Sequence, residues 1–356
     1  MRASSSLIDF LLKEWLLVVS AAGLAATSLH LGRLPRFSSD ELQVLWILAM
    51  LFIAVKGVEK SGLTRNLALR LERGRQVPLK LVLGTFFLSM VITNDVALLA
   101  MVPLTLLLDA RRKGLLVILE ALAANAGSAL TPFGNPQNLF IYWHYELEPL
   151  QFISAIAPFS LFFGGLLTLG ALAVRCRRSV PCPVEQAPVD GHAWLHGMLL
   201  ILLILTVLHL LPLWTTVALP AYALLFDRRS LAIDYALLGT FLCLFGFTDN
   251  LATLLAGELA HRDHVFLFSA LASQVMSNVP AALLFADFTQ HWRALLWGVS
   301  VGGFGTLLAS LANLIAWRLY VRDGNTANAT GFTFAFLGMG FAAFFLGLML
   351  YRLLSA

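Results

Sequence analysis

Four short polar segments interrupt the long apolar runs of this chain, and they hold most of the side chains that could bind a solute. Two are compact, Thr93-Asn94-Asp95 and Ser277-Asn278. The other two, 131–138 and 302–313, combine prolines or glycines with amide and hydroxyl side chains. Amides and hydroxyls donate hydrogen bonds to anions, and carbonyls freed where a helix unwinds can coordinate a cation. The segments therefore predict a site for small ions.

The candidate residues fall into two sets. The candidates for binding a solute carry amide or hydroxyl groups: Thr93, Asn94, Ser277, Asn278, Thr131, Asn135, Thr306 and Ser310. The candidates for binding a coupling ion lie in the first compact segment or in the two longer segments, where we expect the helix to unwind: Asp95, Asn94, Gly134, Gln137, Asn138, Gly305 and Asn313. We expect Na⁺ or H⁺ to be bound in transit, and we expect no resident cofactor, no catalytic residue and no structural metal.

Two acidic residues lie within apolar runs. A carboxylate at mid-membrane depth must be neutral or paired with a cation, so Asp95 could carry a proton or bind sodium. Asp95 could equally cap the helix that follows it, and the two roles are compatible. Glu120 lies closer to a helix end, and we expect it to be solvated or paired.

The composition indicates that these segments lie in a membrane. Hydrophobic residues make up 59% of the 356 residues, charged residues only 12%, and the mean hydropathy is +0.82. A soluble domain carries roughly 25% charged residues, which excludes a water-soluble enzyme. The net charge of +4 does not indicate nucleic acid, because the basic residues lie between the apolar runs. We expect the three cysteines to be free thiols, and we expect no metal site at the pairs His192/His196 and His261/His264.

The apolar runs predict an all-α polytopic membrane protein. Predicted crossings lie near 12–31, 41–58, 115–145, 151–174, 194–212, 213–226, 231–247, 293–320 and 331–353. Two of these, 115–145 and 293–320, carry polar segments and predict broken helices. Two further segments, 77–108 and 264–289, are each interrupted by a polar tip. A straight helix would place those polar groups in lipid, so we predict re-entrant hairpins instead.

Matching motifs predict an inverted repeat. Thr93-Asn94 matches Ser277-Asn278, and residues 131–138 match 306–313 at a constant spacing. The first repeat covers 1–178, the second covers 194–356, and a cytoplasmic linker, 179–193, joins them. Basic residues concentrate in the loops that this topology places in the cytoplasm, with the N-terminus inside and the C-terminus outside. The hairpin 77–108 then enters from the cytoplasm and 264–289 from outside, which is the plan of many secondary transporters.

The four segments together resemble the ion transporter superfamily, which includes divalent-anion/sodium symporters, citrate permeases and arsenical-pump permeases. The pattern over residues 40–350 is most similar to YbiR-type inner-membrane permeases. The resemblance implies a scaffold and a transport domain, elevator-like alternating access and a homodimer. It also implies that Asn94 and Asn278 match the tip asparagines of the dicarboxylate branch. Asp95 and Val279 depart from the threonine expected next, and an Asn-Asp tip is more similar to the arsenical-pump branch.

The sequence thus predicts an ion-coupled permease for a small anion in a bacterial inner membrane. One alternative is a sodium/proton antiporter or an arsenite-type metalloid efflux permease, with Asp95 as the carrier. An intramembrane enzyme is less favoured, because the sequence contains no Walker A motif and no evident nucleophile–base constellation. A channel, which would need a continuous water path, is also less favoured.

Overall fold

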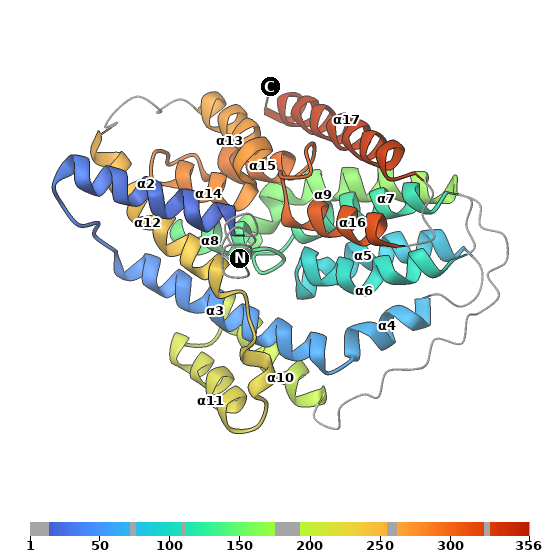
Figure 1. Ribbon diagram of the computed structural model, residues 1–356, viewed down its shortest axis with the longest axis horizontal. Coiled ribbons are helices and arrows are strands. Elements are labelled where there is room, and N and C mark those ends of the chain that lie inside the picture. The colour runs from blue at the N-terminus through green and yellow to red at the C-terminus, as the bar shows by residue number, and fades with distance from the viewer. Residues whose placement is uncertain are drawn as a thin grey trace, which may run out of the picture.

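The computed structural model describes residues 14–71, 76–108, 112–174, 193–254, 262–323 and 328–355, all of them helical or in connecting segments (Figure 1). The helices of the N-terminal part are α2 (Trp15–Leu31), α3 (Ser39–Lys60), α4 (Leu63–Leu71), α5 (Val77–Ile92), α6 (Asn94–Leu107), α7 (Lys113–Ser128), α8 (Pro136–His144) and α9 (Pro149–Leu172). Those of the C-terminal part are α10 (Ala193–Val207), η1 (Leu213–Val217), α11 (Ala218–Leu225), η2 (Arg228–Leu231), α12 (Tyr235–Leu254), α13 (Arg262–Met276), α14 (Asn278–Ala286), α15 (Trp292–Gly302), α16 (Leu311–Arg322) and α17 (Ala329–Ser355).

The prediction of an all-α polytopic membrane protein is confirmed. Within the described residues, α3, α9 and α17 are long and apolar enough to cross a membrane, and several shorter apolar helices accompany them. Many large apolar side chains on their surfaces are exposed, including Leu161, Leu169 and Phe345. Such a surface is stable in lipid rather than in water.

The predicted crossing at 213–226 is wrong as a single full-length helix. The run forms η1, of five residues, followed by α11, of eight. Together the contiguous helical residues Leu213–Leu225 cover about 22 Å, still short of a hydrocarbon core of about 30 Å. Pro212, the residue directly before η1, has an extended backbone, so the helical run starts at Leu213. Figure 1 shows α10 and α11 packed below α3.

The predicted interruptions of the other four segments do occur in the structure. The run 77–108 breaks at Thr93, where φ is 90°, and the run 264–289 breaks at Ser277, where φ is 75°. Residues 129–135 separate α7 from α8, and residues 303–310 separate α15 from α16. On which side of a membrane each pair of short helices begins and ends stays a prediction, as do the repeat and its boundaries.

Gly134 has a packing role in the first unwound segment. A glycine tolerates a positive φ, but among the described glycines only Gly32, Gly62 and Gly305 adopt one. A Cβ at Gly134 would collide with the carbonyl oxygen of Ser128. The glycine is therefore required by close backbone packing, which a sequence cannot display.

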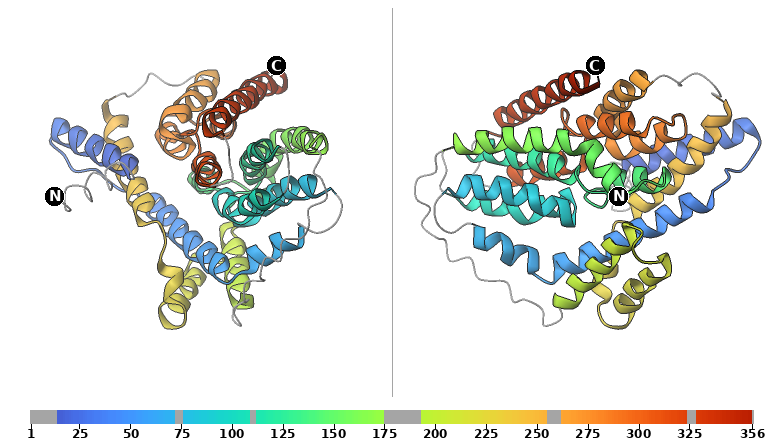
Figure 2. Two further views of the ribbon diagram at one scale, coloured as in Figure 1. Left: turned by 45° about the vertical axis from the view of Figure 1, so that its right-hand side comes forward. Right: turned by 180° about the vertical axis from the view of Figure 1, so that it is seen from behind.

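Two helix groups are interlocked rather than separate. Helices α5, α6, α7 and α9 pack together, and α13, α14 and α15 form a second group (Figure 2). Helix α16 packs against α6 and α7 of the first group, while α8 packs against α14 of the second. The polar segments of both groups are thereby brought to one place in the molecule.

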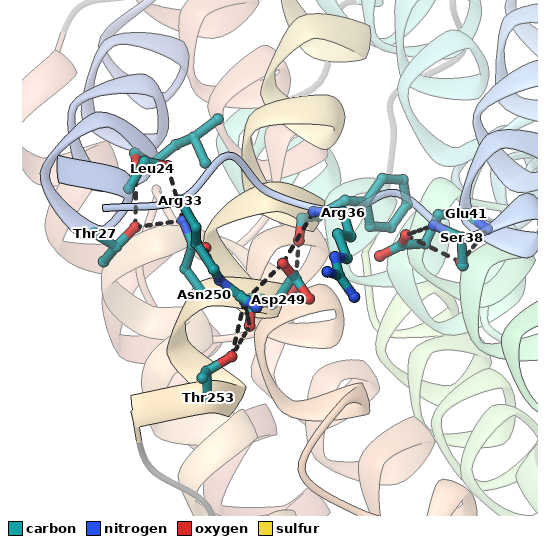
Figure 3. A network of polar contacts seen from close by, with 12 residues as sticks. Leu24, Thr27, Arg33, Arg36, Ser38, Glu41, Asp249, Asn250 and Thr253 are labelled. Atoms are coloured by element: carbon teal, nitrogen blue, oxygen red, sulfur yellow. Dashed lines mark hydrogen bonds and ion pairs between the residues drawn. The ribbon is translucent and has the colours of Figure 1, made fainter. Parts of the chain in front are cut away.

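The loop between α2 and α3 is fastened to the end of α12 (Figure 3). Arg33 Nη2 donates to Asp249 Oδ2 at 2.8 Å and to Thr253 Oγ1 at 2.8 Å, and Arg33 Nε donates to Asn250 Oδ1 at 3.2 Å. The backbone N–H of Arg36 donates to the same Asp249 oxygen at 3.0 Å. These bonds join segments more than 200 residues apart in the sequence.

Candidate functional site

A cavity of about 620 Å³ lies where the polar segments meet. Both tips contribute to its lining: Asn94 and Asp95 follow the first break, while Ser277 and Asn278 mark the second. Gln137, in the first turn of α8, and Ser310, at the end of the second unwound segment, also line it. The structure therefore brings six of the predicted site residues to one cavity.

The other predicted residues lie behind this lining and do not form part of it. They are Thr93, Thr131, Gly134, Asn135, Asn138, Gly305, Thr306 and Asn313. Most of them hold the backbone of the site in place, as their hydrogen bonds show.

Four helices begin at the cavity. Asn94, Pro136, Asn278 and Leu311 are the first residues of α6, α8, α14 and α16, and all four line it. The N-terminus of a helix carries a partial positive charge and N–H groups without intrahelical partners. The convergence of four such termini favours a negatively charged group in the cavity.

The same hydrogen bonds recur around both tips. The N–H of Asn94 donates to the carbonyl of Gly134 at 3.2 Å, and that of Asn278 donates to the carbonyl of Ala309 at 2.9 Å. Each tip is thereby bonded to its neighbouring unwound segment, which fixes the tip despite the strained φ of the residue before it.

Two threonines bond the unwound segments to the helices that precede the tips, α5 and α13. Thr131 Oγ1 donates to the carbonyl of Met90, and Thr306 Oγ1 donates to the carbonyl of Gln274, each at 2.7 Å. Both hydroxyl protons are used inside the protein. Thr131 and Thr306 therefore support the site rather than donating to a solute in this conformation.

Two asparagine side chains also donate hydrogen bonds to backbone carbonyls. Asn138 Nδ2 donates to the carbonyls of Ser128, Ala129 and Thr131 at 3.0–3.1 Å. Asn313 Nδ2 donates to the carbonyls of Gly303 and Thr306, both at 3.0 Å. These amides satisfy carbonyls that unwinding has left without helical partners, a requirement in a water-poor interior.

Asn125, which we did not select from the sequence as a site residue, connects the two groups. Its Nδ2 donates to Asn313 Oδ1 at 2.9 Å. Its Oδ1 accepts from Ser310 Oγ at 2.9 Å and from Asn94 Nδ2 at 3.2 Å. The side chain is 5% exposed. Its place in the polar run 125–128 was the only signal in the sequence, since its partners are far away along the chain.

The cavity has charged groups of both signs. Glu14, Asp95 and Asp234 line it together with Lys56 and Arg318. Lys56 Nζ is paired with Glu59 at 2.9 Å. Asp95 Oδ1 is buried and has no hydrogen-bond partner within the described part of the chain. The side chain therefore does not cap α6 through this oxygen, whose environment suits a proton or a cation.

Glu120 is more deeply buried than we expected from its place near a helix end. It is fully buried, so the solvated alternative is wrong, and its Oε1 accepts a hydrogen bond from Thr105 Oγ1 at 2.6 Å. Helix α6 covers it, a long-range contact that the sequence does not reveal.

The structure describes some of the cysteines and histidines for which we stated expectations. Cys243 is a free thiol, as expected. His196 lies 3.3 Å from Asp227, measured from Nε2 to Oδ2. The remaining expectations concern residues outside the described ranges: Cys176, Cys182, His192, His261 and positions 179–192 of the predicted linker.

Comparisons with known proteins agree with this arrangement. A sequence profile described as citrate transporter matches residues 10–302. The chain is 36% identical over 293 residues to the inner membrane protein YbiR of Escherichia coli K12, covering 76% of this chain and 78% of that protein. It is 31% identical over 303 residues to an uncharacterised transporter of Methanocaldococcus jannaschii, covering 80% and 82%.

A third relative shares a shorter region. The silicon efflux transporter LSI3 of rice is 30% identical over 146 residues, which is 39% of this chain and 30% of the relative. The resemblance to YbiR-type permeases is confirmed, and these relatives are named as transporters or membrane proteins, not as enzymes. The chain belongs to the citrate transporter family and is a multi-pass membrane transporter.

Proposed function

We propose that the protein is an ion-coupled secondary transporter that carries a small anion across the inner membrane. The observation that supports this most is the convergence of both tip asparagines and four helix N-termini on one cavity. Amide donors and helix N-termini both stabilise a negative charge. The citrate transporter profile and the inner-membrane relative support the same proposal.

Some lining residues suit binding of the solute, and others suit binding of the coupling ion. One N–H of Asn94 Nδ2 is used by Asn125, so the second is available for a solute. Asn278 and Ser277 offer an amide and a hydroxyl from the other side. Asp95 would bind the coupling Na⁺ or H⁺, and Gln137 is part of the same lining. The charge of the cation would also reduce the repulsion between Asp95 and an anionic solute.

Elevator-like alternating access is the mechanism we propose for this fold. The two hairpins and the two broken helices would move together as the transport domain, because their tips and unwound segments are bonded to one another. The cation would favour the loaded, closed form and so couple its own gradient to that of the solute. We further propose a homodimer, with the N-terminus in the cytoplasm and the C-terminus outside.

Reconstitution into liposomes tests this function. We expect uptake of at least one small anion, from a panel of inorganic oxyanions and carboxylates, to depend on an imposed Na⁺ or H⁺ gradient. Purified protein should also be stabilised by the transported anion, by about 2.7 kcal/mol at a hundredfold excess over its Kd. The absence of flux under both gradients, for every anion in the panel, would contradict the proposal.

A second candidate is a sodium/proton antiporter or a metalloid efflux permease with Asp95 as the carrier. The buried Asp95 oxygen without a partner favours it, and so does the relationship to a silicon efflux transporter. The variant Asp95→Asn separates the two candidates. An antiporter should lose exchange altogether, whereas the proposed anion symporter should lose the dependence of anion flux on the cation gradient and still exchange its anion between the two sides.

A further inference from the structure

Glu120 is a buried acid that does not line the cavity. It lies on α7 and is 0% exposed. Oε1 accepts the hydroxyl of Thr105, from α6, at 2.6 Å. Oε2 is buried and has no hydrogen-bond partner within the described residues. The transport site described above makes no use of this carboxyl group.

Among the described residues, no cation compensates the carboxyl group. The helices packed against α7 are α5, α6, α9, α16 and α17. The charged or titratable groups on these helices and on α7 itself are Lys80, Asp95, Lys113, Arg318, Tyr320, Arg322, Tyr351 and Arg352. None of the described Lys, Arg or His residues forms an ion pair with Glu120. Lys113, the basic residue on the same helix, directs Nζ to the carbonyl of Leu106 at 2.8 Å.

The geometry suits a neutral carboxylic acid. A carboxylate removed from water without a cation and with one oxygen unbonded is strongly destabilised. In the protonated form, Oε1 is a carbonyl oxygen that accepts from Thr105, and Oε2 carries the proton. We propose that Glu120 is a proton-binding site of this transporter, separate from the cavity and from Asp95.

The position of the proton links it to the packing of α6 on α7. The Thr105–Glu120 bond joins α6, which follows the first tip, to α7, which ends at the first unwound segment. Loss of the proton would leave a charge that only water or a cation could stabilise, so it requires α6 and α7 to separate. At the matching position of the second group, α15 has the buried, apolar Leu295. This proton site therefore belongs to the first group of helices.

Infrared spectroscopy of the purified full-length protein tests the assignment. A protonated carboxyl group has a C=O band that is distinct from the bands of carboxylates and amides. We expect wild-type protein at neutral pH to show this band, Glu120→Gln to lose the Glu120 component, and Asp95→Asn, as the matched control, to retain it. A wild-type spectrum without the band, or a band unchanged in Glu120→Gln, overturns the proposal.

A second variant provides a test if Glu120→Gln does not fold. Thr105→Val keeps the shape of the side chain and removes its hydroxyl, so the C=O band should move to higher frequency as the carbonyl loses its donor. An unshifted band overturns the assignment. Neither measurement needs the transported solute, so its outcome is independent of whether the proposed anion transport is found.

Discussion

Asn125 on α7 donates from Nδ2 to Oδ1 of Asn313 on α16 at 2.9 Å, so one amide joins helices that are 188 residues apart in sequence. The other atom of the same amide accepts from Asn94 and Ser310, both of which line the cavity. All of these side chains are buried. One side chain therefore bonds the first tip to the second unwound segment, in addition to the packing of α16 against α6 and α7.

Asn125→Asp should destabilise the protein and reduce transport. The aspartate keeps the shape but cannot donate to Asn313 Oδ1 or to the carbonyl of Ala121, and it places two acceptors against each other. Leaving a buried polar group unsatisfied costs about 1–3 kcal/mol, and more when a charge is involved. Thermal unfolding of purified protein and flux in liposomes measure the two effects.

Ser300→Ala is the control for this substitution. Ser300 lies on α15 at the position that the predicted repeat matches to Asn125, is 6% exposed, and donates no hydrogen bond to any residue that the structure describes. Its replacement should change stability by less than about 0.5 kcal/mol. If Asn125→Asp were as stable and as active as Ser300→Ala, the amide would not hold the two groups together.

Glycine at the tips should stabilise the protein, and more so at Thr93 than at Ser277. Both residues have a backbone conformation that is almost restricted to glycine, with ψ near 150° at positive φ. Such strain costs about 1–3 kcal/mol, while glycine adds about 0.5–1 kcal/mol of entropy to the unfolded chain. The β-branched Thr93 should be the more strained. Unfolding temperatures of Thr93→Gly and Ser277→Gly test this order, which a lower value for both variants would contradict.

Gly134→Ala should be among the most damaging single-methyl changes in the chain. The new Cβ would collide with the Ser128 carbonyl and displace the Gly134 carbonyl that receives the N–H of Asn94. Overpacking of this kind costs about 1–3 kcal/mol, and displacement of the first tip should also lower flux.

Gly165→Ala is the matched change at an open position. Gly165 lies within α9, and a Cβ there would meet nothing within 4 Å. Alanine should be neutral or stabilising by about 0.5–1 kcal/mol, as in the interior of any helix. Equal effects of the two glycine substitutions on unfolding temperature would show that the 128–134 contact is not tight.

The breaks in the helices could be predicted from the sequence because their cause is local. Asn, Ser, Pro and Gly within an apolar run cannot be satisfied in an unbroken helix surrounded by lipid. Thr93 and Ser277 lie at such breaks, and Pro136 begins a new helix. The convergence of Asn94 and Asn278 followed from the same pattern, since two polar tips in lipid need a shared polar environment.

The supporting contacts could not be predicted, because they depend on which helices become neighbours. Asn125 and Asn313 carry no mark in the sequence that pairs them, and Glu120 is buried only because α6 covers it. The short α11 was missed for a related reason. Its composition is as apolar as that of a crossing, and only the length of the run, which Pro220 interrupts, distinguishes it from one.

Arg33→Lys should weaken the attachment of the α2–α3 loop to α12. A lysine keeps the charge but has no fork that can reach Asp249, Asn250 and Thr253 together. The Arg33 and Asp249 side chains are 32% and 28% exposed, so we expect the free energy of unfolding to fall by about 1 kcal/mol.

Glu59→Gln is the control, because it removes the local ion pair with Lys56 at similar exposure. It should lower the free energy of unfolding by only about 0.2–0.5 kcal/mol. Unfolding temperatures measured at low and high salt check both values, and a larger loss from Glu59→Gln would show that the Arg33 network adds nothing beyond a simple ion pair.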